Sequence, residues 1–197
     1  MKLGFLASHR GSNMQSIIDA CKAGTLAASP VVIISNNADS GALQRAAAEG
    51  IAARHISSAS EGGEENADRA IAGTLGEYEV ELVVLAGYMK RIGPRTLSAF
   101  SNRILNIHPC LLPKYGGQGM YGMRVHEAVI ESGDTESGVT IHLVNEEYDQ
   151  GAILAQEKVP VLQGDTAQSL AERVLQLEHR LYPQTIANII DGRISLG

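Results

Sequence analysis

The chain has 197 residues, of which 44% are hydrophobic, which is enough for one domain with a substantial core or for two small ones. Its formal net charge of −6, without any run of five basic residues, argues against nucleic acid as the main partner. Two cysteines make no disulfide framework and no apolar run approaches the roughly 20 residues of a membrane span, so we expect a reducing, cytoplasmic compartment.

Strand and helix patterns alternate through the first two-thirds of the chain. The run Leu-Val-Val-Leu at 82–85 has no polar alternation, which is typical of a strand covered on both faces. The pattern predicts an α/β fold, a doubly wound, mostly parallel sheet with helices on both faces. Residues 64–78 should form an exposed helix interrupted by Gly73 and Gly76. The expected strands are 3–7, 31–35, 54–56, 81–86 and 103–108, and the expected helices are 13–23, 42–49, 64–78 and 94–100.

The last third of the chain has a different character. Two further strands are expected at 138–144 and 152–161, and the seven residues between them suit a loop joining neighbouring strands, which allows an antiparallel pair. A long amphipathic helix should follow at 166–190. Asp165 is the expected N-cap of this helix, and Pro183 is expected to kink it.

Asn106 and His108 share one face of the strand that ends at Pro109, because side chains alternate along a strand. An amide and an imidazole at the carboxyl end of a strand combine a hydrogen-bond donor with a proton carrier, where open α/β sheets bind their ligands. A single histidine in an apolar strand can also be structural, but the paired Asn106 favours catalysis. His142, between Ile141 and Leu143, has no such neighbour and is interpreted as structural.

The first loop carries Gly11, Ser12 and Asn13 just before a predicted helix. Glycine lets the backbone approach a ligand, and a helix N-terminus offers free N–H groups to an anion such as phosphate. The loop is neither a dinucleotide fingerprint nor a Walker loop. The structural alternative is that Ser12 or Asn13 caps the helix, and both interpretations can hold together.

Asp149-Gln150-Gly151 lies between the two late strands and is most simply a turn. A functional interpretation requires Asp149 to approach His108, where the carboxylate would raise the histidine pKa. The other histidines, including His126, and the two cysteines lack metal-ligand spacing, so we expect no metal site. Four glycines between 114 and 122 predict a mobile segment, either a lid over a site or a plain connection.

Together these residues resemble the folate-dependent formyltransferases. The Asn106-x-His108-Pro109 motif, followed by Leu-Leu-Pro at 111–113, marks the wider family, and the early Gly-Ser-Asn loop with the short length is similar to the phosphoribosylglycinamide formyltransferases. The resemblance implies a Rossmann-like formyltransferase fold in one domain, residues 1–197, with the ribonucleotide phosphate site in the N-terminal half and the folate site in the C-terminal half. The matching stretches are 11–13, 85–89, 106–109, 111–115, 149–151, 178–179 and 182–183.

The resemblance also implies a role for each site residue. The implied catalytic residues are Asn106, His108 and Asp149. The implied substrate-binding residues are Gly11, Ser12 and Asn13 at the phosphate, Pro109, and Glu178 at the glycinamide group. The implied folate-binding residues are Met89, Lys90, Arg91, Ile92, Asn106, Asn145 and Asp149.

The implied reaction transfers the formyl group of the co-substrate 10-formyltetrahydrofolate to the amine of 5′-phosphoribosylglycinamide, in de novo purine (IMP) biosynthesis. Asn106 and a protonated His108 would donate to the oxyanion, while Asp149 keeps His108 charged with a pKa above its free value of about 6.5. Transfer would be direct, without an acyl-enzyme. Both substrates are small molecules, and the protein is expected to be a monomer or homodimer without nucleic-acid or membrane partners.

Three positions depart from the family pattern. Cys110 replaces the usual serine and could be a covalent nucleophile, but neighbouring side chains at a strand end point apart, which disfavours that idea. Glu64 stands where other members carry an arginine near the folate, and the glycine-rich segment 115–122 is longer than in some members.

The alternatives are related enzymes or a binding protein. A formyltetrahydrofolate hydrolase usually has an extra N-terminal domain, which is not expected because the first strand begins at Leu3. A transfer-RNA formyltransferase needs a second, basic domain, which does not fit a net charge of −6. A non-catalytic nucleotide-binding protein on a doubly wound sheet is the third alternative.

Overall fold

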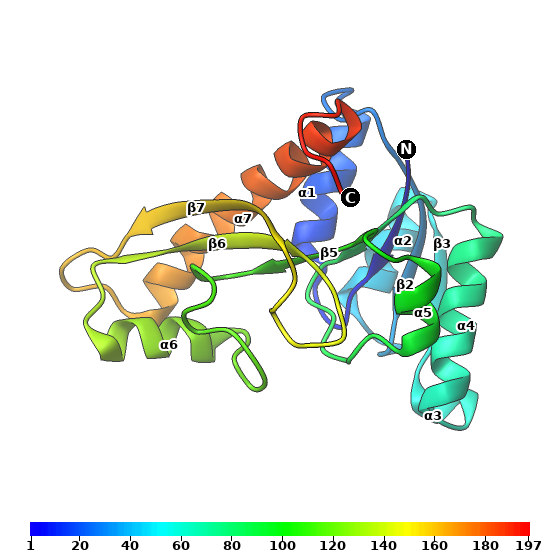
Figure 1. Ribbon diagram of the computed structural model, residues 1–197, viewed down its shortest axis with the longest axis horizontal. Coiled ribbons are helices and arrows are strands. Elements are labelled where there is room, and N and C mark those ends of the chain that lie inside the picture. The colour runs from blue at the N-terminus through cyan, green and yellow to red at the C-terminus, as the bar shows by residue number, and fades with distance from the viewer.

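A single seven-stranded sheet runs through the protein, whose computed structural model describes residues 1–197 (Figure 1). Its strands are β1 (Lys2–Leu6), β2 (Ser29–Ser35), β3 (Ala52–His55), β4 (Leu82–Leu85), β5 (Ile104–His108), β6 (Glu136–Leu143) and β7 (Ile153–Pro160). They lie in the order β3-β2-β1-β4-β5-β6-β7. The first five strands are parallel, and β6 and β7 each run antiparallel to the preceding neighbour. The predicted α/β class, mostly parallel with antiparallel late strands, is confirmed.

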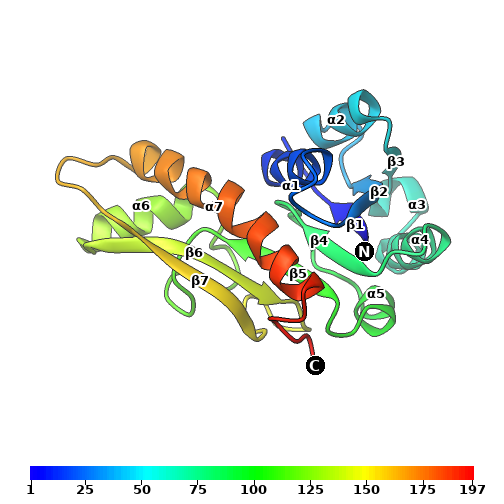
Figure 2. The ribbon, with the colours of Figure 1, turned by 90° about the horizontal axis from the view of Figure 1, so that it is seen from above.

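Helices cover both faces of this sheet, as predicted (Figure 2). They are α1 (Ser12–Lys22), α2 (Gly41–Glu49), α3 (Ser58–Glu61), α4 (Glu64–Glu77), α5 (Pro94–Ala99), α6 (Met123–Ser132) and α7 (Ala167–Ile190). The larger hydrophobic core joins α1, α2, α6 and α7 to one face, and a smaller core joins α4 and α5 to the other. None of the helices combines the length and hydropathy that a transmembrane span requires.

The helix α4 differs from its prediction, because it is continuous and buries one face. Ala67, Ile71 and Leu75 follow one another at four-residue spacing and are buried. Gly73 and Gly76 face open space, where each costs the helix up to about 1 kcal/mol relative to alanine. The buried apolar stripe keeps the helix intact through both glycines.

Two short helices and one cap were not predicted correctly. The helices α3 and α6 are absent from the predicted set, and both lie between more strongly patterned segments. The N-cap of α7 is Thr166, whose hydroxyl accepts from Ser169 N in a capping box, so the expectation for Asp165 is wrong. Asp165 instead binds the Arg173 guanidinium through both carboxylate oxygens. The helix continues through Pro183, and the expected kink remains a prediction.

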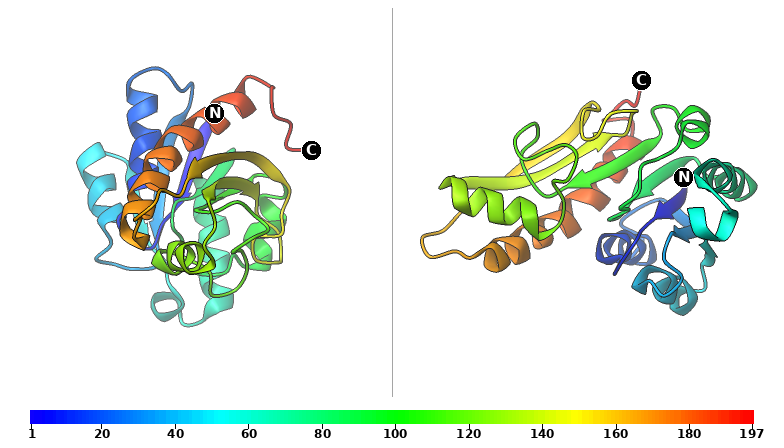
Figure 3. Two further views of the ribbon diagram at one scale, coloured as in Figure 1. Left: turned by 90° about the vertical axis from the view of Figure 1, so that its left-hand side faces the viewer. Right: turned by 90° about the horizontal axis from the view of Figure 1, so that it is seen from below.

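The strand order creates a crevice between β1 and β4, which are neighbours. From β1 the chain moves outward to β2 and β3, whereas from β4 it moves the other way to β5. Such a switch point leaves a crevice at the carboxyl ends of the strands, where α/β proteins bind their ligands. On the side of the molecule away from β3, the elements β6, β7 and α6 extend beyond the parallel part of the sheet (Figure 3).

Candidate active site

A cavity of about 750 Å³ opens at the carboxyl ends of β1, β4 and β5. Its walls come from segments that are far apart in the sequence. They are residues 9–13, 86–90, 106–109, 117–123, 126 and 148–149, together with Ala171, Val174, Leu175 and Glu178 of α7. The cavity therefore includes the loop of Gly11, Ser12 and Asn13, the Asn106-x-His108 motif and Asp149, which the sequence identifies separately.

One end of the cavity is the N-terminus of α1. Gly11 is its N-cap, with φ of 68°, and no side chain caps the helix. A Cβ at Gly11 would come within 3.2 Å of the Ala42 backbone, so only glycine fits this left-handed position without displacement. The predicted capping by Ser12 or Asn13 is wrong, and the free N–H groups of the first turn remain available to an anion.

Glu178 of α7 lies at the same end and is 7% exposed. Its Oε2 accepts a hydrogen bond of 2.9 Å from the Asn13 amide, which leaves the buried Asn13 Oδ1 without a partner. Burial raises the pKa of Glu178 to about 7, although the Asn13 hydrogen bond opposes this shift. A carboxyl group that titrates near neutral pH therefore lies beside the α1 N-terminus.

Asn106 and His142 face each other across the antiparallel pair of β5 and β6. The Asn106 Nδ2 lies 3.2 Å from His142 Nε2, and His142 Nδ1 lies 2.8 Å from the Leu143 carbonyl oxygen. Because a carbonyl only accepts, His142 Nδ1 carries a proton, and its Nε2 faces both the Asn106 amide and Asp149 Oδ1. The second N–H of that amide is free to donate to a ligand.

His108 is fixed by its backbone neighbour and by Asp149. Its Nε2 donates to the Tyr115 carbonyl oxygen at 2.9 Å, so its Nδ1 is the nitrogen that faces Asp149 Oδ2, at 3.6 Å. The same carboxylate accepts from Gly117 N at 2.9 Å and lies 3.5 Å from His142 Nε2. The approach of Asp149 to His108, across about 40 residues of sequence, is present in the fold.

Burial controls the ionisation of this group. It lowers the pKa of His108 below its ordinary value and outweighs both Asp149 and the Tyr115 carbonyl, which act to raise the pKa. The prediction of a His108 pKa above its free value is therefore wrong. For Asp149, burial acts to raise the pKa, but His142, His108 and Gly117 N together hold it below the usual carboxyl value.

The remaining predicted ligand-binding residues lie in or beside the large cavity. Pro109, Met89 and Lys90 line it. A smaller cavity of about 80 Å³ adjoins it and shares five residues with it, Tyr88, Lys90, Asn106, Tyr148 and Asp149. Arg91, Ile92 and Asn145 line the smaller cavity. Glu64, in the first turn of α4, lines neither cavity, and both cavities draw on both halves of the chain.

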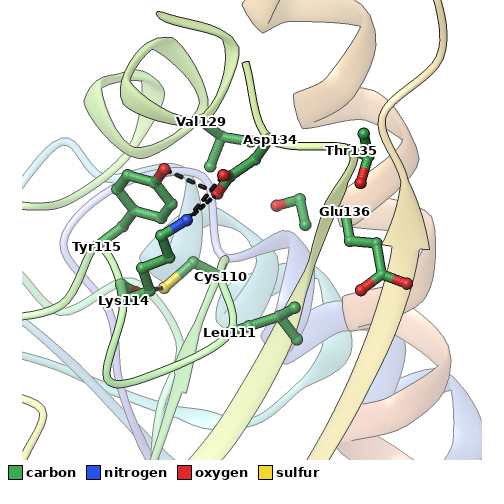
Figure 4. A pocket seen from close by; sticks show the side chains of 9 residues that line it. Cys110, Leu111, Lys114, Tyr115, Val129, Asp134, Thr135 and Glu136 are labelled. Carbon is green, nitrogen blue, oxygen red and sulfur yellow. Dashed lines mark hydrogen bonds and ion pairs between the residues drawn. The ribbon is translucent and has the colours of Figure 1, made fainter. Parts of the chain in front are cut away.

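Cys110 points away from the large cavity, into a separate cavity of about 210 Å³ beside the loop 109–115 (Figure 4). Its Sγ donates to the Lys114 carbonyl at 2.8 Å, and burial raises the pKa of the thiol to about 12. A nucleophile needs a thiolate in contact with substrate, so the geometry disfavours a covalent role.

Figure 4 also shows how this loop is held. The Lys114 ammonium lies 2.7 and 2.6 Å from the two Asp134 oxygens, and the Tyr115 hydroxyl donates to Asp134 at 2.8 Å. Since the Tyr115 carbonyl accepts from His108, Asp134 secures the residue that fixes the His108 tautomer.

The sequence interpretation missed two histidines in the cavity region. His142 was taken as structural, and only the β5–β6 register places it opposite Asn106. His126, in the unpredicted helix α6, lines the large cavity. A helical reading of 123–132, with Val125, His126 and Val129 on its buried side, was the available signal.

Comparisons with known proteins agree on one family. The model of the family described as formyl transferase matches residues 1–186. The chloroplastic phosphoribosylglycinamide formyltransferase of Arabidopsis thaliana is 43% identical over 194 residues, covering 98% of this chain and 66% of that protein. This chain thus spans about two thirds of the plant relative. Phosphoribosylglycinamide formyltransferase of Escherichia coli K12 is 38% identical over 196 residues, covering 100% of this chain and 90% of that protein. The crystal structure of glycinamide ribonucleotide transformylase 1 from Symbiobacterium toebii superimposes with a TM-score of 0.91 at 40% identity, covering 98% of this chain and 89% of that one.

Proposed function

Since the chain belongs to the formyl transferase family, and within it to the phosphoribosylglycinamide formyltransferases, we propose that it moves the formyl group of 10-formyltetrahydrofolate to the amine of 5′-phosphoribosylglycinamide in purine biosynthesis. The observation that carries this proposal is the meeting of Asn106, His108 and Asp149 in one cavity. The proposed unit is a single domain, 1–197, acting on two small molecules as a monomer or homodimer.

The two substrates fit different parts of the cavity. The ribonucleotide phosphate accepts hydrogen bonds from the free backbone N–H groups of Gly11, Ser12 and Asn13, and Glu178 binds the glycinamide end. The pteridine end of the folate lies at the smaller adjoining cavity, whose lining includes residues 90–92 and 145–149. The residues shared by both cavities, Asn106 and Asp149 among them, then lie where the amine and the formyl carbon meet.

The positions of the proton and the lone pair on the His108 ring suggest how the transfer proceeds. The neutral ring has its proton on Nε2, held by Tyr115, and a lone pair on Nδ1. The neutral amine attacks the formyl carbon, and the new ammonium gives its proton to Nδ1. The resulting imidazolium is stabilised by Asp149 and returns the proton to N10 of the folate as the C–N10 bond breaks. No acyl-enzyme forms.

Two donors stabilise the oxyanion, one during the attack and one after it. One is the Asn106 N–H that does not bind His142. The other is Nδ1–H of His108, which becomes a donor once it has received the proton. Removing one such donor typically costs about 10²–10³ in kcat. This order of events replaces the expectation of a His108 that is already protonated before substrates bind.

Turnover of 10-formyltetrahydrofolate, with and without the ribonucleotide amine, tests the proposed function. We expect folate turnover only when the amine is present, with the formyl group recovered on the amine. Turnover without the amine would identify a hydrolase, and no turnover under either condition would favour a binding protein. The proposed state of His108 is tested separately by histidine NMR titration of the free protein, assigned with His108→Ala. A pKa above about 6.5 would overturn the neutral-base mechanism.

A further inference from the structure

His126 is a buried imidazole that neither packing nor the proposed mechanism explains. It lies in α6, is 5% exposed, and lines the large cavity. Its Nδ1 is sealed from solvent without a hydrogen-bond partner, and Nε2 has no partner either but remains accessible from the cavity. A buried polar group without a partner is rare in folded proteins and destabilises them relative to an apolar group of the same shape.

The protonation state of His126 follows from these surroundings. Burial, together with the nearby His108, lowers the pKa of His126 to about 4, so the ring is neutral near pH 7. A neutral ring carries one proton, and that proton is better placed on Nε2, which can reach a partner, than on the sealed Nδ1. His126 therefore presents an uncharged N–H donor to the cavity.

The N-terminus of α6 supplies donors at the same place. Gly122 is the N-cap, and no side chain caps this ten-residue helix. Gly122 and Met123 line the cavity together with His126. Free N–H groups and the positive end of the helix dipole favour an oxygen acceptor there.

The position of His126 indicates which substrate it meets. It borders the large cavity, which contains Glu178 and the α1 N-terminus, and it does not border the smaller cavity assigned to the folate. It is also close enough to His108 for the two rings to influence each other. In the ribonucleotide, the oxygen nearest to the reacting amine is that of the glycinamide carbonyl, whose carbon is bonded to the CH2 group that carries the amine.

We propose that His126 Nε2–H, with the first turn of α6, binds the glycinamide carbonyl oxygen of the ribonucleotide. This inference rests on the proposed function, because it assumes that ligand in the large cavity. His126 thereby orients the amine toward the formyl carbon, and this role explains why an imidazole lies on the buried side of α6 with Val125 and Val129.

Two substitutions separate binding from packing. His126→Leu keeps a similar volume and removes both nitrogens, whereas His126→Gln keeps an N–H close to the Nε2 position. We expect the leucine variant to raise KM for the ribonucleotide about tenfold, the usual scale for one lost hydrogen bond, with KM for the folate unchanged. The glutamine variant should restore most of this loss. An unchanged ribonucleotide KM in a folded leucine variant, or a rise confined to the folate KM, would overturn the proposal.

Direct binding distinguishes failure of this inference from failure of the proposed function. Calorimetry with the ribonucleotide alone needs no turnover, and we expect the leucine variant to bind about tenfold more weakly than the natural protein. Should the leucine variant not fold, the Nε2–H resonance of His126 in the natural protein should shift when the ribonucleotide is added. A ribonucleotide that binds the natural protein without moving that resonance would refute the contact.

Discussion

Replacing Glu178 by glutamine should stabilise the protein against unfolding, increasingly so as the pH rises. Burial raises the pKa of this carboxyl from 4.5 to about 7. Between these values the unfolded chain ionises Glu178 while the folded protein keeps it protonated, so stability falls as the pH rises. Glutamine does not titrate and can still accept the Asn13 hydrogen bond.

The magnitude follows from the shift. A difference of 2.5 pKa units, from 4.5 to about 7, corresponds to about 3 kcal/mol at 1.36 kcal/mol per unit. The stability difference between Glu178→Gln and the natural protein should therefore grow by about 3 kcal/mol between about pH 4.5 and pH 8. Above pH 7 the difference should level off, because both states of the natural protein are then ionised.

Urea unfolding of both proteins at several pH values between 4.5 and 8 measures this difference, and subtracting the two curves removes all other titrating groups. Glu172→Gln is the matched control, since it makes the same change at an exposed position of the same helix. Its difference from the natural protein should stay within about 0.5 kcal/mol at every pH. If the difference in unfolding free energy between Glu178→Gln and the natural protein did not change with pH, the argument that burial keeps Glu178 protonated would be refuted.

Three further predictions concern the residues around His108. His108→Ala and Asp149→Asn should each lower kcat at least about a hundredfold in steady-state assays, and a near-normal rate in either would contradict the mechanism. Cys110→Ser should keep kcat within about threefold, because the thiol is buried away from the substrates; a folded but inactive variant would revive a covalent intermediate. Tyr115→Phe removes the hydroxyl bound by Asp134 and loosens the carbonyl that raises the His108 pKa, so the NMR titration of His108 should move to lower pH. An unchanged titration would mean that the backbone alone holds this carbonyl.

The fold was largely predictable because its strongest signals are local. The unbroken apolar run of β4 could only be a strand covered on both faces, and Gly50, with φ of 67°, ends α2 where the sequence placed the stop. The N-cap of α7 could not be predicted from local signals, because a side-chain contact decides which residue becomes the cap. Asp165 and Thr166 can both cap a helix, and the Arg173 guanidinium, eight residues away, engages Asp165 and leaves Thr166 as the cap.

The site was predictable in its residues but not in its ionisation. Alternation along β5 places Asn106 and His108 on one face without any knowledge of the fold. The net pKa of His108, in contrast, is the balance of a burial penalty against a carboxylate at 3.6 Å and a carbonyl at 2.9 Å. Each contribution depends on distances between segments, and no spacing along the chain reveals which one prevails.

The two histidines nearest to Asp149 are arranged alike, and this arrangement fits the proposed reaction. A backbone carbonyl accepts from Nε2–H of His108, and another accepts from Nδ1–H of His142, so the second nitrogen of each ring faces the same carboxylate. The lowered pKa of Asp149 keeps a proton off the carboxylate, so a proton taken up by Nδ1 of His108 stays on the imidazole. Formyl transfer to an amine requires one proton to leave the amine and reach N10 of the folate. Nδ1 of His108, beside Asp149, is therefore the atom that holds this proton in the proposed reaction.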